Sequence, residues 1–306
     1  MTWLLYLLSY LPFGFLHIVS RFNFALLYYG IRYRRTVVQE NLLRSFPNET
    51  AIWRKNIEKK FYQNFCDLMV ESLKTTSCSK SHLRKRCVFT EQSSIFLEDS
   101  LKAKQNCLVI CSHLANWEWL PLALSLETKF KLFGVYKPLS SLKMNTFMLK
   151  TRERFGVKMI TSKELRGFFG KPKNFPYLIG LVPDQAPHDY SKAFQFEFLN
   201  QMTYFFPGPG ILCAQHGLLP VYVWMRRAGG RSRFEMGTDP IHINENESLS
   251  NFELEQIERV AKAHAVSSLE TTRAYRIVKE YSKLLENQIK MAPEDWLWSH
   301  KRWKKR

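Results

Sequence analysis

The sequence has few cysteines and few acidic residues, and each shortage excludes some classes of protein. Its six cysteines form no CxxC pair and match no zinc-ligand spacing. This argues against a disulfide-stabilised scaffold and a structural zinc site, so we expect reduced thiols, no metal and no cofactor. Two of the cysteines, Cys107 and Cys111, lie in an apolar stretch and are expected to be small core residues.

The shortage of acidic residues makes the chain strongly basic. Against 45 Lys+Arg stand only 27 Asp+Glu, which gives a formal net charge of +18. Such a balance indicates an anionic partner, whether nucleic acid, an anionic membrane, or an acidic protein or substrate. The aromatic content of 14% suits a membrane surface at least as well as nucleic acid. Because no helix-turn-helix or zinc-finger pattern appears, we expect no nucleic-acid partner.

The first twenty residues contain no Lys, Arg, Asp or Glu. A secretory signal would begin with basic residues and end at a small-residue cleavage site, so we do not expect cleavage. Pro12 and Gly14 interrupt the apolar run, which makes its length marginal for a spanning helix. Two short helices in the membrane interface fit as well. A buried helical hairpin of a soluble protein is the alternative.

An arginine cluster follows this apolar segment at 32–35. The positive-inside rule places such a cluster on the cytoplasmic side of a membrane. We therefore divide the chain into an N-terminal membrane anchor or pair of interfacial helices, 1–31, and one domain, 32–306. A chain of 306 residues is long enough for a large core.

The pattern after position 34 is first helical and then alternating. Apolar residues at helical spacing predict helices over 37–46 and 51–73. Strands are then predicted at 107–111, 131–136, 157–160, 177–182 and 219–227 and near 233–237, with helices at 116–126, 141–155, 162–169, 207–216 and 251–288. Such alternation is typical of an α/β sandwich with a mixed, largely parallel sheet.

His113 and Glu118 lie where the strand over 107–111 gives way to a helix. Reactive groups of α/β sheets collect at such strand ends. In a continuous α-helix, two side chains five positions apart point about 140° away from each other. We therefore place His113 in the loop just before the helix, where Glu118 can reach its ring. The carboxylate would fix one imidazole tautomer, and His113 would take a proton from a substrate hydroxyl. The alternative is a structural histidine beside a solvated glutamate, and the spacing alone does not exclude it.

The stretch SHLANWEW, 112–119, resembles the H-x4-D/E motif of glycerolipid acyltransferases, and in particular the late acyltransferases of bacterial lipid A biosynthesis. Other stretches agree in the family's order: RRTVVQENLLRSFP, VYKPL with RERFG, GLVPDQAP, FFPGPGILCAQHGLLPVYVW and PEDWLWSHKRWKKR. The resemblance implies an α/β/α acyltransferase sandwich at the bacterial inner membrane, with its catalytic domain facing the cytoplasm. It also implies an acyl carrier protein thioester as donor and a phosphorylated lipid A precursor as acceptor.

Several polar residues of these stretches are predicted to bind substrate. Arginine binds phosphate through a two-pronged fork, so Arg152 and Arg154 are phosphate ligands, with a solvated helix face as the alternative. Lys137 could also meet an anion, although the family often has Arg there. Asp184 and Gln185 could order the loop or bind the acceptor sugar. The remaining predicted residues are donors to the oxyanion: Asn116, Gly208 and Gly210. For Asn116 the favoured alternative is an N-cap of the following helix.

Two other hypotheses remain at the level of the sequence. The first is the same chemistry on another acceptor, such as a glycolipid, an aminolipid or a phosphoinositide mannoside. The second is a basic membrane- or nucleic-acid-binding module without catalysis, which the net charge alone permits.

A run of aromatic residues, 194–206, is expected either to line an acyl groove or to pack in the core.

Overall fold

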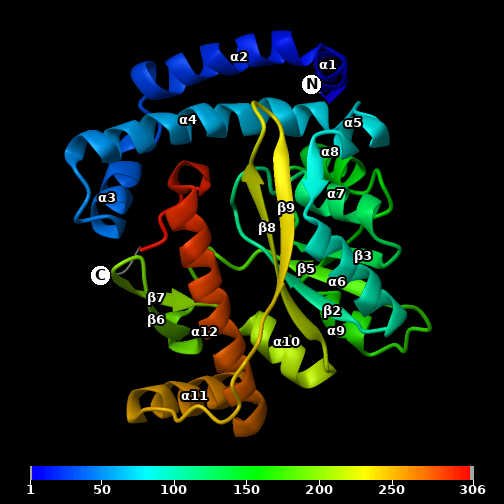
Figure 1. The fold of residues 1–306 in the computed structure, drawn as a ribbon, viewed down its shortest axis with the longest axis vertical. Coiled ribbons are helices and arrows are strands. Elements are labelled where there is room, and N and C mark those ends of the chain that lie inside the picture. Colours follow the sequence, from blue (N-terminus) through cyan, green and yellow to red (C-terminus); the bar gives the residue numbers. More distant parts are fainter. Residues whose placement is uncertain (1, 304–306) are drawn as a thin grey trace.

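The computed structural model describes residues 2–303, so the ends of the predicted segments, Met1 and 304–306, lie outside the described residues. A seven-stranded sheet of order β1-β9-β8-β2-β5-β3-β4 forms its centre (Figure 1). The strands are β1 (Cys87–Phe89), β2 (Cys107–Ile110), β3 (Lys131–Tyr136), β4 (Lys158–Thr161), β5 (Tyr177–Leu181), β8 (Leu219–Arg227) and β9 (Phe234–Pro240). Neighbouring strands are parallel except β8 and β9. The predicted mixed, largely parallel sheet is confirmed.

Helices cover both faces of the sheet, as side chains of β2 illustrate. Leu108 and Ile110 pack into one core with α10 (Gly208–His216) and α12 (Ser268–Met291). Cys107, Val109 and Cys111 point into a second core, as the alternation of a strand requires. The second core includes residues of α5 (Lys80–Arg84), α6 (Glu91–Lys102) and α7 (Leu120–Glu127). All six cysteines are buried free thiols, and burial raises the pKa of Cys107 to about 12.

The remaining elements surround this sandwich. A separate antiparallel hairpin is formed by β6 (Phe194–Phe198) and β7 (Gln201–Phe205), which the sequence analysis treated only as an aromatic run. The other helices are α3 (Arg35–Ser45), α4 (Ala51–Lys74), α8 (Leu142–Arg152), α9 (Leu165–Phe169) and α11 (Asn251–His264), with short 3-10 turns at Tyr190–Lys192 and Pro293–Asp295. β1, α5 and α6 were also not predicted from the sequence.

Two predicted helices were wrong in their extent. The helix predicted over 251–288 is split, because Ala265 adopts a left-handed conformation and Ser267 starts α12 with a capping box. The helix predicted from 116 begins at Leu120 as α7. Asn116 to Trp119 therefore form a turn, and Glu118 precedes the helix rather than lying on it.

The N-terminal segment consists of α1 (Thr2–Ser9), α2 (Phe13–Ala25) and one π-helical turn (Leu26–Gly30). Pro12 falls in the break, as the sequence indicated, and α2 lies along α4 (Figure 1). Within residues 2–303 no single helix has the length and apolarity to cross a bilayer. The helical segments Trp3–Ser9 and Phe13–Gly30, which are bent by 118° relative to each other, are together long and apolar enough to do so. Membrane association of 1–31 stays a prediction.

The exposed surface of this pair is largely apolar, with Arg21 of α2 as an exposed charge. Its exposed large side chains include Trp3, Leu7, Tyr10, Phe15, Ile18, Phe22 and Tyr29. The inner side of α2, by contrast, buries Phe13, Leu16 and Ser20. A bilayer would cover the outer surface without disturbing the packing of α2 on α4.

Gly210 allows α10 to approach α12. A Cβ atom at this position would lie 2.7 Å from the Cα atom of Ala274, and backbone cannot move aside as a side chain can. We expect Gly210→Ala to lower the free energy of unfolding by about 1–3 kcal/mol, measured by thermal or denaturant unfolding. The matched control is Gly167→Ala in α9, where a Cβ meets no atom within 4 Å. Equal unfolding free energies for the two variants would contradict this account.

Candidate active site

The loops after β2 and β5 bring His113 and Asp184 together. These strands are parallel neighbours, with Ile110 opposite Leu181, so both loops leave the same edge of the sheet. The backbone N–H of His113 donates to Asp184 Oδ2 at 2.9 Å, and the ring atom Nδ1 lies 2.6 Å from Oδ1. Trp296 donates its indole N–H to Asp184 Oδ2 at 2.9 Å. Asp184 is thus fixed from two sides.

The pair is electrostatically coupled. Burial lowers the pKa of His113, but the charge and hydrogen bond of Asp184 together with the charge of Glu118 outweigh it, so the pKa lies above the ordinary value. Burial in turn raises the pKa of Asp184, yet His113 and Trp296 outweigh it and the pKa is lowered. Asp184 is therefore ionised at neutral pH.

This contact fixes the tautomer of the imidazole. An ionised carboxylate only accepts hydrogen bonds, so Nδ1 carries the proton and Nε2 keeps its lone pair. The His113 side chain is 18% exposed, and Gln185 Nε2 lies 3.3 Å from His113 Nε2. The ring of Trp117 lies edge-on to the imidazole at 5.0 Å between centroids. Nε2 thus offers a lone pair at a partly exposed edge of the ring, with the exposed side chain of Gln185 in front of it.

Glu118 does not hold the imidazole, contrary to the sequence-based expectation. Its two oxygens accept from Arg152, Nε at 2.9 Å and Nη2 at 2.6 Å. The reason is the turn at 116–119, which directs Glu118 toward the end of α8 instead of back over the ring. Glu118 still acts on the imidazole through space, because it raises the pKa of His113, less than Asp184 does.

The turn between His113 and Glu118 is strained and tightly held. Ala115 has φ +50°, a left-handed conformation that costs a non-glycine residue about 1–2 kcal/mol. Its N–H donates to the Asp295 carbonyl at 3.0 Å, and Leu114 forms a β-bridge with Trp296. Asn116 is fully buried, and its side-chain oxygen accepts from the N–H of Trp119 at 2.9 Å. Asn116 therefore closes the turn at 116–119 and does not cap α7, whose N-cap residue is Trp119.

The other predicted residues are dispersed. Arg154 points away from Arg152 and donates to the Thr75 carbonyl at the end of α4. Lys137 is exposed just after β3. Gly210 serves helix packing on α12, and a Cβ at Gly208 would collide with the ring of Phe206. The structure therefore gathers His113, Glu118, Arg152, Asp184 and Gln185 at one place and leaves the others outside their direct contacts.

The aromatic run is mostly core. Phe194, Phe196, Phe198 and Phe205 are buried, while Phe206 is exposed. Trp119 is also fully buried, so of the two tryptophans beside the histidine only Trp117 contacts the imidazole.

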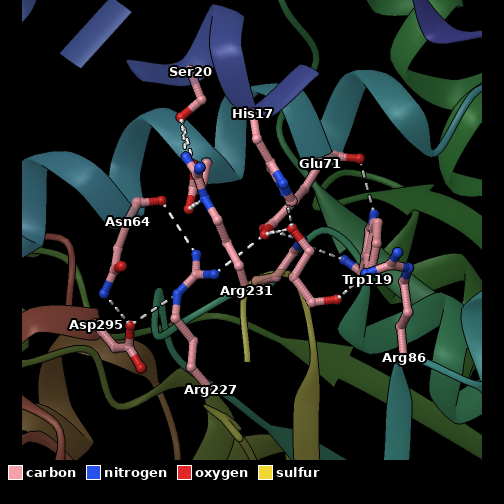
Figure 2. Close-up of polar contacts among 12 residues, drawn as sticks. His17, Ser20, Asn64, Glu71, Arg86, Trp119, Arg227, Arg231 and Asp295 are labelled. Atoms are coloured by element: carbon pink, nitrogen blue, oxygen red, sulfur yellow. Dashed lines mark hydrogen bonds and ion pairs between the residues drawn. The ribbon is translucent and has the colours of Figure 1, made fainter. Parts of the chain in front are cut away.

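The residues that support the turn at 113–118 from behind were not predicted from the sequence. They are Glu71 on α4, Arg227 at the end of β8, and Asp295 and Trp296 near the C-terminus. Figure 2 shows Asn64, Arg227 and Asp295 meeting, with Arg227 Nε 3.2 Å from Asp295 Oδ1. An available signal was the PEDWLW stretch, in which the resemblance was seen but no residue was given a role. Within the described chain, no three His, Cys, Asp or Glu side chains are placed to hold a metal.

Comparison with known families gives a match over residues 2–305 to a family described as "Bacterial lipid A biosynthesis acyltransferase". The chain belongs to this family. It is therefore an acyltransferase of lipid A biosynthesis, which uses an acyl donor and a lipid A precursor as acceptor. A search of curated proteins gave no match. The H-x4-E stretch and the residues around His113 thus belong to a lipid A acyltransferase.

Proposed function

We propose that the enzyme transfers a fatty acyl chain from an acyl carrier protein thioester to a hydroxyl of a phosphorylated lipid A precursor. The observation that carries this proposal is the His113 imidazole, held at Nδ1 by a buried carboxylate and open at Nε2. A substrate that brings its own hydroxyl needs no protein nucleophile, only a positioned base.

In the proposed reaction, the acceptor hydroxyl replaces Gln185 in front of His113. Nε2 takes the hydroxyl proton while the oxygen attacks the thioester carbonyl, and Asp184 stabilises the imidazolium. The tetrahedral intermediate then collapses: the carbon–sulfur bond breaks, and the leaving sulfur takes the proton from His113. The products are the ester and the free carrier thiol, and His113 returns to its neutral state.

The charges near His113 suit a phosphorylated acceptor. Arg152 is held beside the base by Glu118, and its pKa is raised, because burial alone would lower it but Glu118 outweighs burial. We propose that Arg152 contacts an acceptor phosphate, with Lys137 as a second cation. The first-turn N–H groups of α10, at Gly208 and Gly210, are the proposed oxyanion donors. We assign no ligand role to Arg154 or Asn116, whose groups contact Thr75, Glu71 and Trp119.

The N-terminal helix pair is proposed to lie in the bacterial inner membrane, with the catalytic domain on the cytoplasmic side. Its apolar outer surface supports membrane contact, and the arginines at 32–35 support the orientation. The net charge of +18 suits both an acidic carrier protein and an anionic acceptor.

The test combines purified full-length enzyme in detergent with acyl-loaded carrier protein and a phosphorylated lipid A precursor. We expect the precursor to gain one acyl ester, detected by mass spectrometry. Lipids from cells with and without the gene give the second reading, and lipid A should lose one acyl chain. Loss of a chain from another glycolipid would shift the proposal to that acceptor, and unchanged lipids with no transfer in vitro would refute it.

A further inference from the structure

A buried carboxylate lies behind the catalytic turn, on α4. Glu71 is fully buried. Its Oε1 atom accepts from Arg227 Nη1 at 3.2 Å and from Ser232 Oγ at 2.7 Å, whereas Oε2 accepts from Asn116 Nδ2 at 2.9 Å. Figure 2 shows Glu71 among side chains from α2, α4 and the β8–β9 hairpin. One oxygen thus serves charge pairing, and the other serves the segment between His113 and Glu118.

The orientation of Asn116 makes this second contact specific. Its amide oxygen is already bound to the N–H of Trp119, so the amide cannot turn over without losing that bond. The Nδ2 group must therefore face α4, and only an acceptor satisfies it there. Trp119 is held by the same helix, because its indole N–H donates to the Glu71 carbonyl at 3.0 Å and to Thr75 Oγ1 at 2.8 Å.

The turn needs such support, because its conformation is unfavourable in isolation. Ala115 has a positive φ, and the surrounding contacts must hold it there. Asp295 and Trp296 hold the His113 side of the turn, while Glu71 and Thr75 hold the Glu118 side.

We propose that Glu71 is a positioning residue of the transfer reaction: through Asn116 it fixes the turn that sets His113 against Asp184 and Glu118 against Arg152. This inference rests on the proposed function. Glu71 touches neither substrate nor reacting atoms and acts only through the turn. Small displacements of a base from its reacting hydrogen lower rates strongly, by up to about 10²-fold for 1 Å.

A neighbouring carboxylate provides the matched control. Asp67 lies one turn earlier on α4, is also buried, and accepts from Arg231 Nε at 2.7 Å and from Ser20 Oγ at 2.5 Å. Its partners belong to α2 and the β8–β9 hairpin, not to the turn at 113–118. Asp67→Asn should therefore lower the melting temperature while leaving kcat unchanged.

The experiment exchanges donor and acceptor between Glu71 and Asn116. In Glu71→Gln the remaining oxygen is needed by the two donors Arg227 and Ser232, so the amide N–H faces Asn116 Nδ2. We expect kcat to fall by about 10–100-fold with KM within about twofold. In Asn116→Asp two carboxylates meet, so they share one proton and activity is lost as pH rises. The double variant Glu71→Gln/Asn116→Asp restores both a hydrogen bond and a single charge, and should recover kcat to within about threefold of wild type.

A second measurement does not depend on acyl transfer. Carbethoxylation of His113 by diethyl pyrocarbonate, followed across pH by peptide mass spectrometry, reports the pKa of its imidazole. If Glu71 positions the turn, that pKa falls in Glu71→Gln and returns in the double variant, while Asp67→Asn leaves it unchanged. A folded Glu71→Gln enzyme with wild-type kcat and an unchanged His113 titration would overturn the proposal. A wild-type enzyme without transfer would refute the proposed function, and the titration would still decide the role of Glu71.

Discussion

Replacing His113 with alanine should lower kcat by about 10²–10⁴-fold, the usual contribution of a general base. The melting temperature should change little. The backbone N–H of residue 113 and the Trp296 indole still donate to Asp184 in this variant, so the buried carboxylate keeps two partners. The KM for the acyl-loaded carrier protein should stay near that of wild type, because the proposed role of His113 lies in the chemical step. Initial rates with acyl carrier protein and the lipid A precursor measure both constants.

The control for this variant is His188→Ala. His188 is an exposed histidine of the same loop as Asp184 and Gln185, and the site does not use it. We expect wild-type rates for it. Full activity of folded His113→Ala would remove the proposed mechanism altogether, because no other imidazole has been assigned to the reaction.

Replacing Asp184 with asparagine should lower kcat by about 10²–10⁴-fold as well. An asparagine can hold the imidazole in the other tautomer, with a proton on Nε2, where the base is needed. The acid limb of the kcat/KM profile should also move. In wild type the pKa of His113 is raised, so the neutral base is lost as pH falls through a value above the ordinary one. Without the Asp184 charge the pKa drops, and the limb moves to lower pH.

The variant Glu118→Gln distinguishes the effect of Glu118 on the pH profile from that of Asp184. Glu118 also raises the pKa of His113, but less than Asp184 and without touching the ring. Its removal should weaken the placement of Arg152 and lower the rate, with a smaller shift of the acid limb. A larger shift for Glu118→Gln than for Asp184→Asn would restore Glu118 as the partner of the imidazole.

The sequence was sufficient to predict the sandwich, the sheet type and the position of His113 at a strand end, because these depend on local patterning. The unbroken apolar runs at 107–111 and 177–182 mark strands that are buried on both faces, as in a parallel sheet. The break at Pro12 was equally local. The split between α11 and α12 was missed because apolar spacing continues through 251–288 and Ala265 carries no residue-type signal for a left-handed conformation. The available signal was the capping pattern of Ser267 and Glu270, which starts α12.

The partners of the site residues could not be predicted in the same way. Which carboxylate reaches His113 depends on the pairing of β2 with β5, a contact between residues 71 positions apart. Asp184 was therefore identified as a site residue, but its contact with the ring was not. Glu71, Arg227 and Asp295 were missed because a charged residue on an amphipathic helix or at a strand end is usually solvated. Only the three-dimensional arrangement shows that Glu71 and Asp295 are buried and that the partly buried Arg227 pairs with both.

The bond between Arg152 and Glu118 uses one edge of the guanidinium, Nε with Nη2. A guanidinium also has a second edge, formed by Nη1 and the remaining N–H of Nη2, which can bind another anion in the same plane. A phosphate on that edge would be joined to Glu118, and so to the segment carrying the base, by a single flat group. Acceptors that lack the phosphate would then be turned over more slowly as well as bound more weakly.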